Sequence, residues 1–478
     1  MMRSRLPAAA FLAALLAGCM TVGPDYKRPP TDVPEQWPGT PAQGAPVPAD
    51  WWLAYNDPVL NRLVDDALLN NLDLRQAVAR VAEARAALGI TRADRYPGVT
   101  AQAGASRNRT SENSILAFPG VDPEYSDYRA SLNVGYEIDF WGKYRRATEA
   151  ARAELLASRF NRDAVRLTLV TDVARGYFAL RALDAQVEVT RRTISSRLAS
   201  TALQRKRFEA GLASEFDLRQ SEAEAAQAQA LLPTIESRQA QQETALAVLV
   251  GRSPREIVAR PVDRGTAIEA IVPPPAVPAG LPSELLERRP DLRAAEQALV
   301  VANARIGQAR AAYYPSISLT GILGVESTSL GDLFRTSSRY WTLGANAAQT
   351  VFDAGRTGSQ VEAAQAREQQ ALAQYQSSIQ RAFKDALDAL VIQRKARETL
   401  EAETVRRDAL RTALGLAQMR YDNGVSSLLD VLISERALLE AELNRVEAQR
   451  AQLSATADLF KALGGGWTPE PEKSATAN

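Results

Sequence analysis

Histidine is absent from all 478 residues of the chain. Histidine is the most frequent general base of enzymes and the commonest metal ligand in proteins. Its absence therefore excludes histidine-based catalytic triads and histidine metal sites. A carboxylate or lysine enzyme would still fit this composition, but the sequence contains no motif for one. The sequence therefore predicts a protein that is not an enzyme and that binds no metal or cofactor.

An excess of charge of either sign is also lacking. The 57 lysines and arginines are balanced by 56 aspartates and glutamates, and the formal net charge is +1. This balance gives no electrostatic reason to bind nucleic acid or an acidic partner. Cysteine is scarce as well, because Cys19 is the only one and cannot form a disulfide within the chain.

The chain begins with a basic and then apolar segment, in which Arg3 and Arg5 precede the apolar residues 6–17. The apolar run is too short to span a bilayer, so residues 1–18 are predicted to be a signal peptide. The junction Leu16-Ala17-Gly18-Cys19 resembles the bacterial lipobox, in which the cysteine is lipidated and becomes the mature N-terminus. In such lipoproteins Met20, following the cysteine, favours the outer membrane. The alternative is an ordinary signal peptide that ends in a chance cysteine.

Residues 19–57 are rich in proline and glycine and contain Trp37, Trp51 and Trp52. This composition predicts an extended arm that lies on a surface, rather than a folded domain. The resemblance to the lipobox implies that a lipid on Cys19 anchors this arm. Helical periodicity begins near Pro58 and ends at Tyr96-Pro97, because proline disfavours the helical conformation in the residue before it.

Two similar segments, 207–218 and 420–431, each lie in the middle of a very long helical pattern. Each predicts the sharp reversal of a helical hairpin, with a glycine that can adopt the left-handed conformation at the end of one helix. A serine can then cap the next helix, and an aspartate three residues later lies near its positive end. The matching residues are Gly211 and Gly424, Ser214 and Ser427, and Asp217 and Asp430.

Two stretches after the first helix alternate between apolar and polar residues. In residues 98–106 the apolar positions are odd-numbered, and in residues 131–140 they are even-numbered. A period of two with one apolar and one polar face predicts β-strands between unlike media. On the polar face, Glu137 and Asp139 either line a lumen or are simply solvated.

The whole plan occurs twice. Residues 73–97 align with 291–315 without a gap, with 11 identities in 25 positions. The offset between the copies is 218 residues before the β-hairpin and 213 after it, so this is an internal duplication. The predicted domains are repeat 1 at 58–251 (β-hairpin 98–140, tip near 211), a linker at 252–282, repeat 2 at 283–464 (β-hairpin 315–352, tip near 424) and a flexible tail at 465–478. A kink or break is expected at Pro233 in the return helix of repeat 1.

Four strands in one chain leave two unpaired edges, and hydrocarbon cannot satisfy the polar groups on them. If the strands lie in a membrane, several chains must therefore close one barrel. The alternative is a soluble four-stranded sheet packed on helices. The apolar stripes of the long hairpins argue against it, because they need neighbours that one chain can scarcely provide.

Several motifs resemble the TolC-like outer membrane factors, specifically the OprM/NodT lipoprotein branch. They are residues 19–26 with Arg28-Pro29, residues 136–143, Arg288-Arg289-Pro290-Asp291 with Ala295-Glu296, and the tip at 420–430. Together they cover nearly the whole mature chain. The resemblance implies a mainly α fold with a membrane β-barrel part: a homotrimer in which four strands per protomer form a 12-stranded barrel above a long periplasmic α-helical barrel.

The resemblance also implies a function. The protein would be the outer membrane channel lipoprotein of a tripartite efflux pump, a passive duct for drugs or other small toxic compounds. Its partners would be a periplasmic adaptor protein, an inner-membrane transporter of the resistance-nodulation-division type and outer membrane lipid. The only attached group would be a covalent lipid on Cys19.

The hairpin tips would form the periplasmic gate, and the turns at Gly211 and Gly424 would dock the adaptor. Leu429 matches a leucine that narrows the closed entrance in the relatives, although it is equally compatible with a knob in a coiled coil. Some relatives place an aspartate ring one turn later, where this chain has Ile433. Asp217 and Asp430, near Ser214 and Ser427, act either as helix caps alone or also in gating.

Two other functions are compatible with the sequence. The same fold serves as the exit tunnel of type I protein secretion systems, although the lipobox and the proline-rich arm favour efflux. A lipid-anchored periplasmic scaffold without a pore is the third possibility.

Overall fold

The computed structural model describes residues 21–37, 47–111, 113, 122–274 and 282–465. The chain forms two compact units. The first contains the residues up to 30, 80–158 and 294–376, and the second contains residues 31–79, 159–293 and those from 377 onward. The predicted signal peptide, Cys19 and the tail from residue 466 lie outside the described residues.

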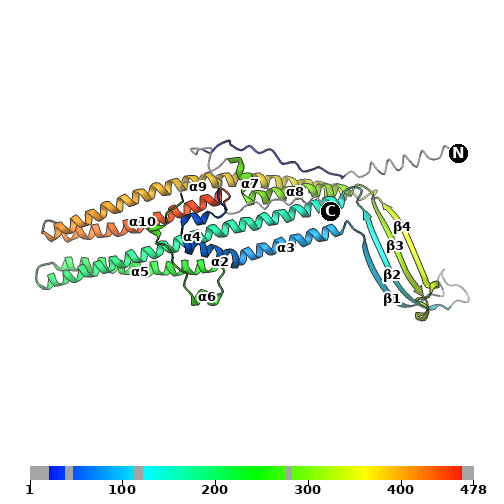
Figure 1. Ribbon diagram of the computed structural model, residues 1–478, viewed down its shortest axis with the longest axis horizontal. Coiled ribbons are helices and arrows are strands. Elements are labelled where there is room, and N and C mark those ends of the chain that lie inside the picture. Colours follow the sequence, from blue (N-terminus) through cyan, green and yellow to red (C-terminus); the bar gives the residue numbers. More distant parts are fainter. Residues whose placement is uncertain (1–20, 38–46, 112, 114–121, 275–281, 466–478) are drawn as a thin grey trace. The chain divides into compact units, whose positions relative to one another are not determined.

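The same series of elements occurs twice along the chain, as the colours in Figure 1 show. The first series is α2 (Pro58–Asn70), α3 (Leu72–Ala93), β1 (Gly98–Arg109), β2 (Glu124–Ile138), α4 (Lys143–Glu209) and α5 (Glu215–Leu249). The second is α7 (Leu285–Arg288), α8 (Pro290–Ala311), β3 (Ser316–Ser327), β4 (Arg339–Ala348), α9 (Arg356–Asp422) and α10 (Leu428–Ala462). The remaining short helices are η1 (Trp51–Tyr55), α6 (Pro254–Ala259), η2 (Ile268–Ala270), η3 (Pro282–Glu284), η4 (Leu330–Asp332) and η5 (Thr336–Ser338). This order confirms the predicted duplication.

The four strands form one antiparallel sheet in the order β1-β2-β3-β4. β1 pairs with β2 so that Gly98 lies opposite Gly135, and β3 pairs with β4 so that Ser316 lies opposite Ala348. The two hairpins are joined through β2 and β3, where Ile138 lies opposite Ile317. The predicted strands are therefore present, and the apolar positions of neighbouring strands face the same side.

In the first unit, small side chains pack the helices closely. Val81 and Leu88 of α3 pack against Ala151 and Leu155 of α4. A second cluster joins Ala150 and Ala153 of α4 to Val301 and Ala304 of α8. Alanine allows helix axes to approach closely, which explains why the pattern along α4 is rich in alanine rather than in large apolar residues.

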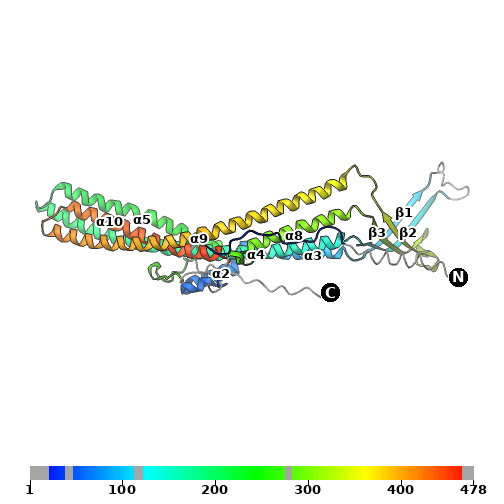
Figure 2. The same ribbon diagram turned by 90° about the horizontal axis from the view of Figure 1, so that it is seen from above.

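In the second unit, α5 returns beside α4 and α10 returns beside α9, as both ribbon views show (Figures 1 and 2). The core of this unit is aromatic. The ring of Trp51 stacks on Phe460 at 5.1 Å between centroids, and Tyr55 lies 4.9 Å from Phe178. The Tyr177 hydroxyl donates to the buried Asp57 carboxylate at 2.7 Å, and the carboxylate also caps α2.

Three segments differ from the sequence interpretation. Part of the predicted surface arm forms η1, because Trp51 and Trp52 bury their rings in the core of the second unit. The predicted linker contains α6 and η2 and buries Ile268 and Ile271 in the same core. The proline content of this segment therefore obscured the ordered structure of residues 252–274.

The predicted break at Pro233 is wrong, because α5 continues as one helix from Glu215 to Leu249. A kink at this position stays a prediction. The proline is on the exposed side of the helix. The carbonyl that loses its helical hydrogen bond there can bind water instead, which reduces the cost of the proline. Within the described residues, no helix combines the length and the apolar character needed to cross a membrane.

Candidate functional site

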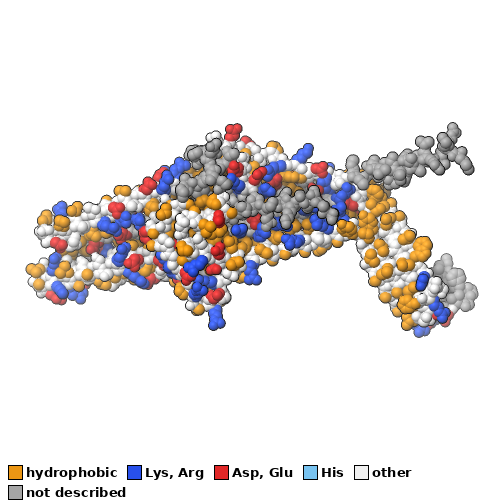
Figure 3. Space-filling model, in the orientation of Figure 1, with side chains coloured by type: hydrophobic (Ala, Val, Ile, Leu, Met, Phe, Trp, Pro, Cys, Tyr) orange, Lys and Arg blue, Asp and Glu red, His pale blue; other side chains and the backbone are white. Residues whose placement is uncertain are grey.

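One face of the sheet carries exposed apolar side chains. Ala101, Leu132, Leu323 and Trp341 lie opposite one another across all four strands. The Trp341 side chain is 71% exposed. Other exposed apolar residues on this face are Val99, Val134, Leu319 and Leu343. Figure 3 shows hydrophobic side chains gathered along the strands. A continuous exposed patch of this kind marks a surface for a membrane or a partner.

The opposite face of the sheet is polar. Arg129 lies opposite Glu326 and contacts its carboxylate at 3.0 Å. Two carboxylates of this face are bound where β2 leads into α4. Glu137 accepts from Lys143 Nζ at 3.0 Å, and Asp139 accepts from the backbone N–H of Arg145 at 2.9 Å. Asp139 therefore stabilises the start of α4, where a negative charge is favourable.

The two tip turns have nearly identical backbones. Gly211 has a φ of +70° and Gly424 a φ of +69°. After the first glycine, the Leu212 N–H donates to the Arg207 carbonyl at 2.7 Å, and the Val425 N–H donates to the Arg420 carbonyl at 2.8 Å in the second tip. These are the bonds of a helix that ends in a left-handed glycine.

Both predicted serine–aspartate pairs lie at the start of the return helices. The Ser214 hydroxyl donates to Asp217 at 2.7 Å, and the Asp217 N–H donates back to the Ser214 oxygen at 3.1 Å. At the second tip, the N–H and the hydroxyl of Ser427 each donate to Asp430 at 3.1 Å. Both aspartates therefore cap helices, and a further role in gating stays a prediction.

A link between the two hairpins was not evident from the sequence. The Tyr421 hydroxyl, on α9, accepts from Gln204 Nε2 at 2.9 Å and from Arg207 Nη1 at 3.0 Å, both on α4. The Arg207 guanidinium also lies over the Tyr421 ring, 5.4 Å from its centroid. The equivalent residue of the first tip is Phe208, which has no hydroxyl. We call Gln204, Arg207 and Tyr421 the tip clamp.

Apolar side chains near the tips divide between buried and exposed faces of α10. Leu428, Val431 and Leu432 are buried. Leu429 and Ile433, one turn apart, are each 46% exposed. Leu429 therefore does not fill the core of its own chain and is free to face a neighbouring molecule or an opening.

A buried charge cluster lies between α4, α5 and α10. Arg197 Nη1 contacts the Glu224 carboxylate at 3.2 Å, and its Nε lies 3.9 Å from Glu435. The Arg197 side chain is 3% exposed. Burial raises the pKa of Glu435, and the neighbouring Glu224 adds to the effect while Arg197 opposes it. Ionised Glu435 is therefore only partly compensated by its partner.

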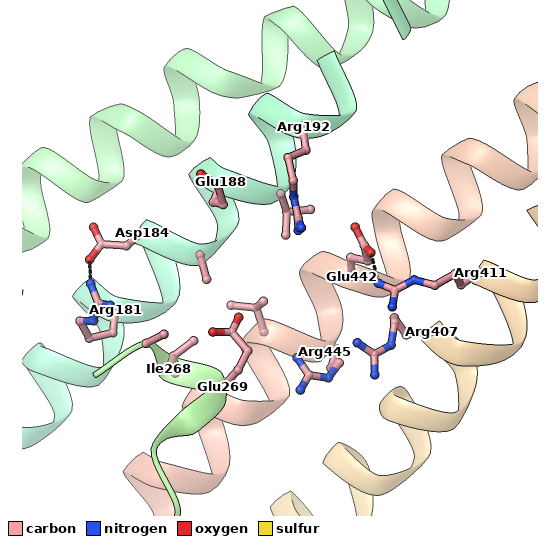
Figure 4. A pocket seen from close by; sticks show the side chains of 14 residues that line it. Arg181, Asp184, Glu188, Arg192, Ile268, Glu269, Arg407, Arg411, Glu442 and Arg445 are labelled. Atoms are coloured by element: carbon pink, nitrogen blue, oxygen red, sulfur yellow. Dashed lines mark hydrogen bonds and ion pairs between the residues drawn. The ribbon is translucent and has the colours of Figure 1, made fainter. Parts of the chain in front are cut away.

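A cavity of about 440 Å³ lies between α4, α9, α10 and η2, as Figure 4 shows. It is lined by five arginines and four acidic residues, and Arg411 pairs with Glu442 at 2.7 Å. The lining contains no serine, cysteine, lysine or tyrosine that could act as a nucleophile. Among the described residues, no group of three or more acidic, histidine or cysteine side chains is arranged to hold a metal ion.

The first described residues of the N-terminal arm, 21–30, belong to the first unit and are held there mainly by residues of the resemblance motifs. The Arg28 guanidinium donates two hydrogen bonds to Glu296, at 2.8 and 2.7 Å. Burial and the Glu296 carboxylate raise the pKa of Tyr26, whose hydroxyl donates to the same group. Further along, Arg146 binds Asp25 at 2.7 Å. Two motifs 268 residues apart therefore form one contact.

The arm also packs against a glycine of α8. A Cβ atom added to Gly307 would lie 2.7 Å from the Val22 carbonyl and 2.9 Å from Arg146 Cγ. The Val22 N–H donates to the Trp141 carbonyl at 3.0 Å. Because Val22 is only three residues after Cys19, these contacts fix the position of the chain close to the predicted lipid attachment.

Comparisons with known proteins agree over nearly the full length. The family model described as "Outer membrane efflux protein" matches residues 63–252 and 281–465. The solvent efflux pump outer membrane protein SrpC of Pseudomonas putida is 36% identical over 96% of this chain and 97% of its own. The probable outer membrane lipoprotein SilC of Salmonella typhimurium is 34% identical over 95% and 97%. The crystal structure of the Campylobacter jejuni outer membrane channel CmeC superimposes with a TM-score of 0.89, at 26% identity over 94% and 95% of the chains.

Proposed function

The chain belongs to the outer membrane efflux protein family, and we propose that it forms a homotrimeric duct that expels small toxic compounds. Membership makes it the outer membrane channel of an efflux pump and not an enzyme.

The four-stranded sheet is the main support for a trimer. Its apolar face is exposed along all four strands, and its two outer edges have no partner strand among the described residues. In hydrocarbon, every backbone donor and acceptor must be satisfied, so the edges must pair with other copies of the chain. Three copies would contribute twelve strands, a number that closes a barrel wide enough for a channel.

We propose that the hairpin tips form the periplasmic entrance and that the tip clamp holds it closed. Tyr421 connects the second hairpin to Gln204 and Arg207 of the first, so separation of the hairpins breaks these bonds. The exposed Leu429 narrows the opening, and Asp217 and Asp430 place carboxylates beside it. The turns at Gly211 and Gly424 are open on their outer side, with nothing within 4 Å of an added Cβ, and suit an adaptor protein.

The N-terminal arm supports a lipid anchor on Cys19. The docked segment that begins at Val22 runs beside the strand-to-helix junction at Trp141, so a lipid on Cys19 would lie near the membrane end of the first unit. We propose a periplasmic adaptor and an inner-membrane transporter of the resistance-nodulation-division type as partners, because a passive duct has no energy source of its own.

Transport in cells tests the cargo class. The chain is expressed with its adaptor and transporter in a strain that lacks its own channel, and the accumulation of a fluorescent hydrophobic dye is measured. The proposal predicts that the wild-type chain lowers dye accumulation and that omission of the transporter abolishes this effect. Unchanged dye accumulation together with restored export of a protein would favour a secretion tunnel, which shares the fold. Neither effect, together with no ion conductance in lipid bilayers, would favour a scaffold.

A further inference from the structure

β1 and β4 are the two edge strands of the sheet. The outer edge of β1 and the outer edge of β4 pair with no strand of the described chain. From the internal duplication we propose the register in which these edges meet: β4 of one copy pairs antiparallel with β1 of the next, with Ala347 opposite Ala103. This inference rests on the proposed trimer and adds the residue-by-residue contact that closes it.

The duplication predicts strand register correctly within the chain. Residue numbers in the first strand of a hairpin shift by 218 between repeats, and those in the second strand shift by 213. Applied to the pair Gly98 and Gly135, these shifts give Ser316 and Ala348, which are paired in the structure. The two hairpins are therefore equivalent in register, and the same shifts can be applied to the joint between them.

The joint between the repeats is the pairing of β2 with β3. It places the end of repeat 1 against the start of repeat 2, with Ile138 opposite Ile317. The equivalent joint between copies places the end of repeat 2 against the start of repeat 1. Ile138 shifted forward by 213 is Val351, and Ile317 shifted back by 218 is Val99. Val351 therefore lies opposite Val99 of the next copy, and Ala347 lies opposite Ala103.

The side-chain pattern supports this register independently. On β1 the apolar positions are odd-numbered, as Val99 and Ala103 are, and on β4 they are also odd-numbered, as Trp341 and Leu343 are. The proposed register pairs odd with odd, so the apolar face continues from one copy to the next. A slip by one residue would turn the apolar residues of one strand toward the polar side of its neighbour.

The register also explains two exposed apolar residues. Val351 is 94% exposed and Phe352 is 87% exposed, and both follow the end of β4 at Ala348. The equivalent of Val351 in repeat 1, Ile138, is half-buried and still part of β2. Pairing with the next copy would extend β4 through Val351 in the same way, and would place Phe352 opposite Gly98.

Cysteine pairs in the full-length chain test the register. One variant combines Ala103→Cys with Ala347→Cys, and a second combines Gln102→Cys with Ala348→Cys, so that both types of antiparallel pair are sampled. The control combines Ala105→Cys with Ala347→Cys, which is offset by two residues and whose Cα atoms would be about 7–8 Å apart. Within one chain, β1 and β4 are three strand spacings apart, about 14 Å, so an intrachain bond cannot form.

The variants are oxidised in outer membranes, and covalent products are resolved by denaturing electrophoresis. The proposal predicts dimer and trimer bands for the first two variants and at least fivefold less product for the control. Stronger cross-linking of the control would overturn the register while leaving the trimer intact. The absence of bands in every variant, with a native mass of three chains, would show that these edges do not meet. A native mass of one chain would instead contradict the proposed trimer itself.

Discussion

Loss of the Tyr421 hydroxyl is expected to open the channel. The Tyr421→Phe substitution keeps the ring under the Arg207 guanidinium but removes the acceptor of two hydrogen bonds, from Gln204 at 2.9 Å and from Arg207 at 3.0 Å. A neutral hydrogen bond contributes about 1 kcal/mol net, and one from a charged group contributes somewhat more. Because both hydrogen bonds are partly exposed to water, together they stabilise the closed tips by about 2 kcal/mol per protomer. Since 1.4 kcal/mol is a factor of ten, the ratio of open to closed tips should rise roughly 30-fold.

Single-channel recording in planar bilayers measures this change as the fraction of time spent at high conductance. The matched control is Arg205→Gln, which removes an ion pair to Glu222 at 2.8 Å within the first hairpin only. The control should leave the open fraction at the wild-type value. Equal open fractions in wild type and Tyr421→Phe would refute the clamp. An equal rise in both variants would mean that any weakening of the tips opens them, and that the link between hairpins has no special part.

Two further predictions concern stability. Gly307→Ala should lower the melting temperature of the detergent-solubilised protein, because the added Cβ would lie 2.7 Å from the Val22 carbonyl. The control is Gly89→Ala at the equivalent position of repeat 1, where an added Cβ has nothing within 4 Å and alanine should stabilise the helix by up to about 1 kcal/mol. Equal shifts of the melting temperature in both variants would contradict the close packing of the arm. The pKa of Glu435 is raised from its ordinary value of 4.5, so the folded state favours the protonated side chain. The stability that this protonated group contributes is therefore fully present below pH 4.5 and is lost as the pH rises through the raised pKa. Glu435→Gln should therefore melt above wild type at pH 7–8, with a difference that closes toward pH 4.5, and a penalty that is independent of pH would mean that its contact with Arg197 dominates.

The local sequence pattern was sufficient to predict those strands and turns whose conformation depends on residues close in sequence. The alternation along residues 131–140 predicted a strand with one apolar face, and β2 follows it. Gly211 and Gly424 predicted the tip turns, since only a left-handed residue ends a helix in this way. The resemblance to TolC-like channels, drawn from short motifs, is confirmed by the family match.

Contacts between distant residues were not predictable from pattern. Tyr421 and Gln204 are 217 residues apart, and nothing local marks a tyrosine hydroxyl as a link rather than a surface group. Arg28 and Glu296 were both part of recognised motifs, but only the fold places them together. The ordered structure of residues 252–274 was missed for a related reason, because Ile268 and Ile271 are buried by helices far away in sequence.

If the exposed face of the sheet lies in lipid, as we propose, Trp341 on β4 can report this directly. The purified protein is reconstituted in vesicles whose acyl chains carry bromine, which quenches tryptophan fluorescence on contact. The other tryptophans with described side chains are buried or half-buried, so Trp341 should dominate the quenching, and Trp341→Phe should remove most of it. Quenching that is the same in wild type and Trp341→Phe would show that the sheet does not touch hydrocarbon, and would contradict the assignment of the strands to the membrane.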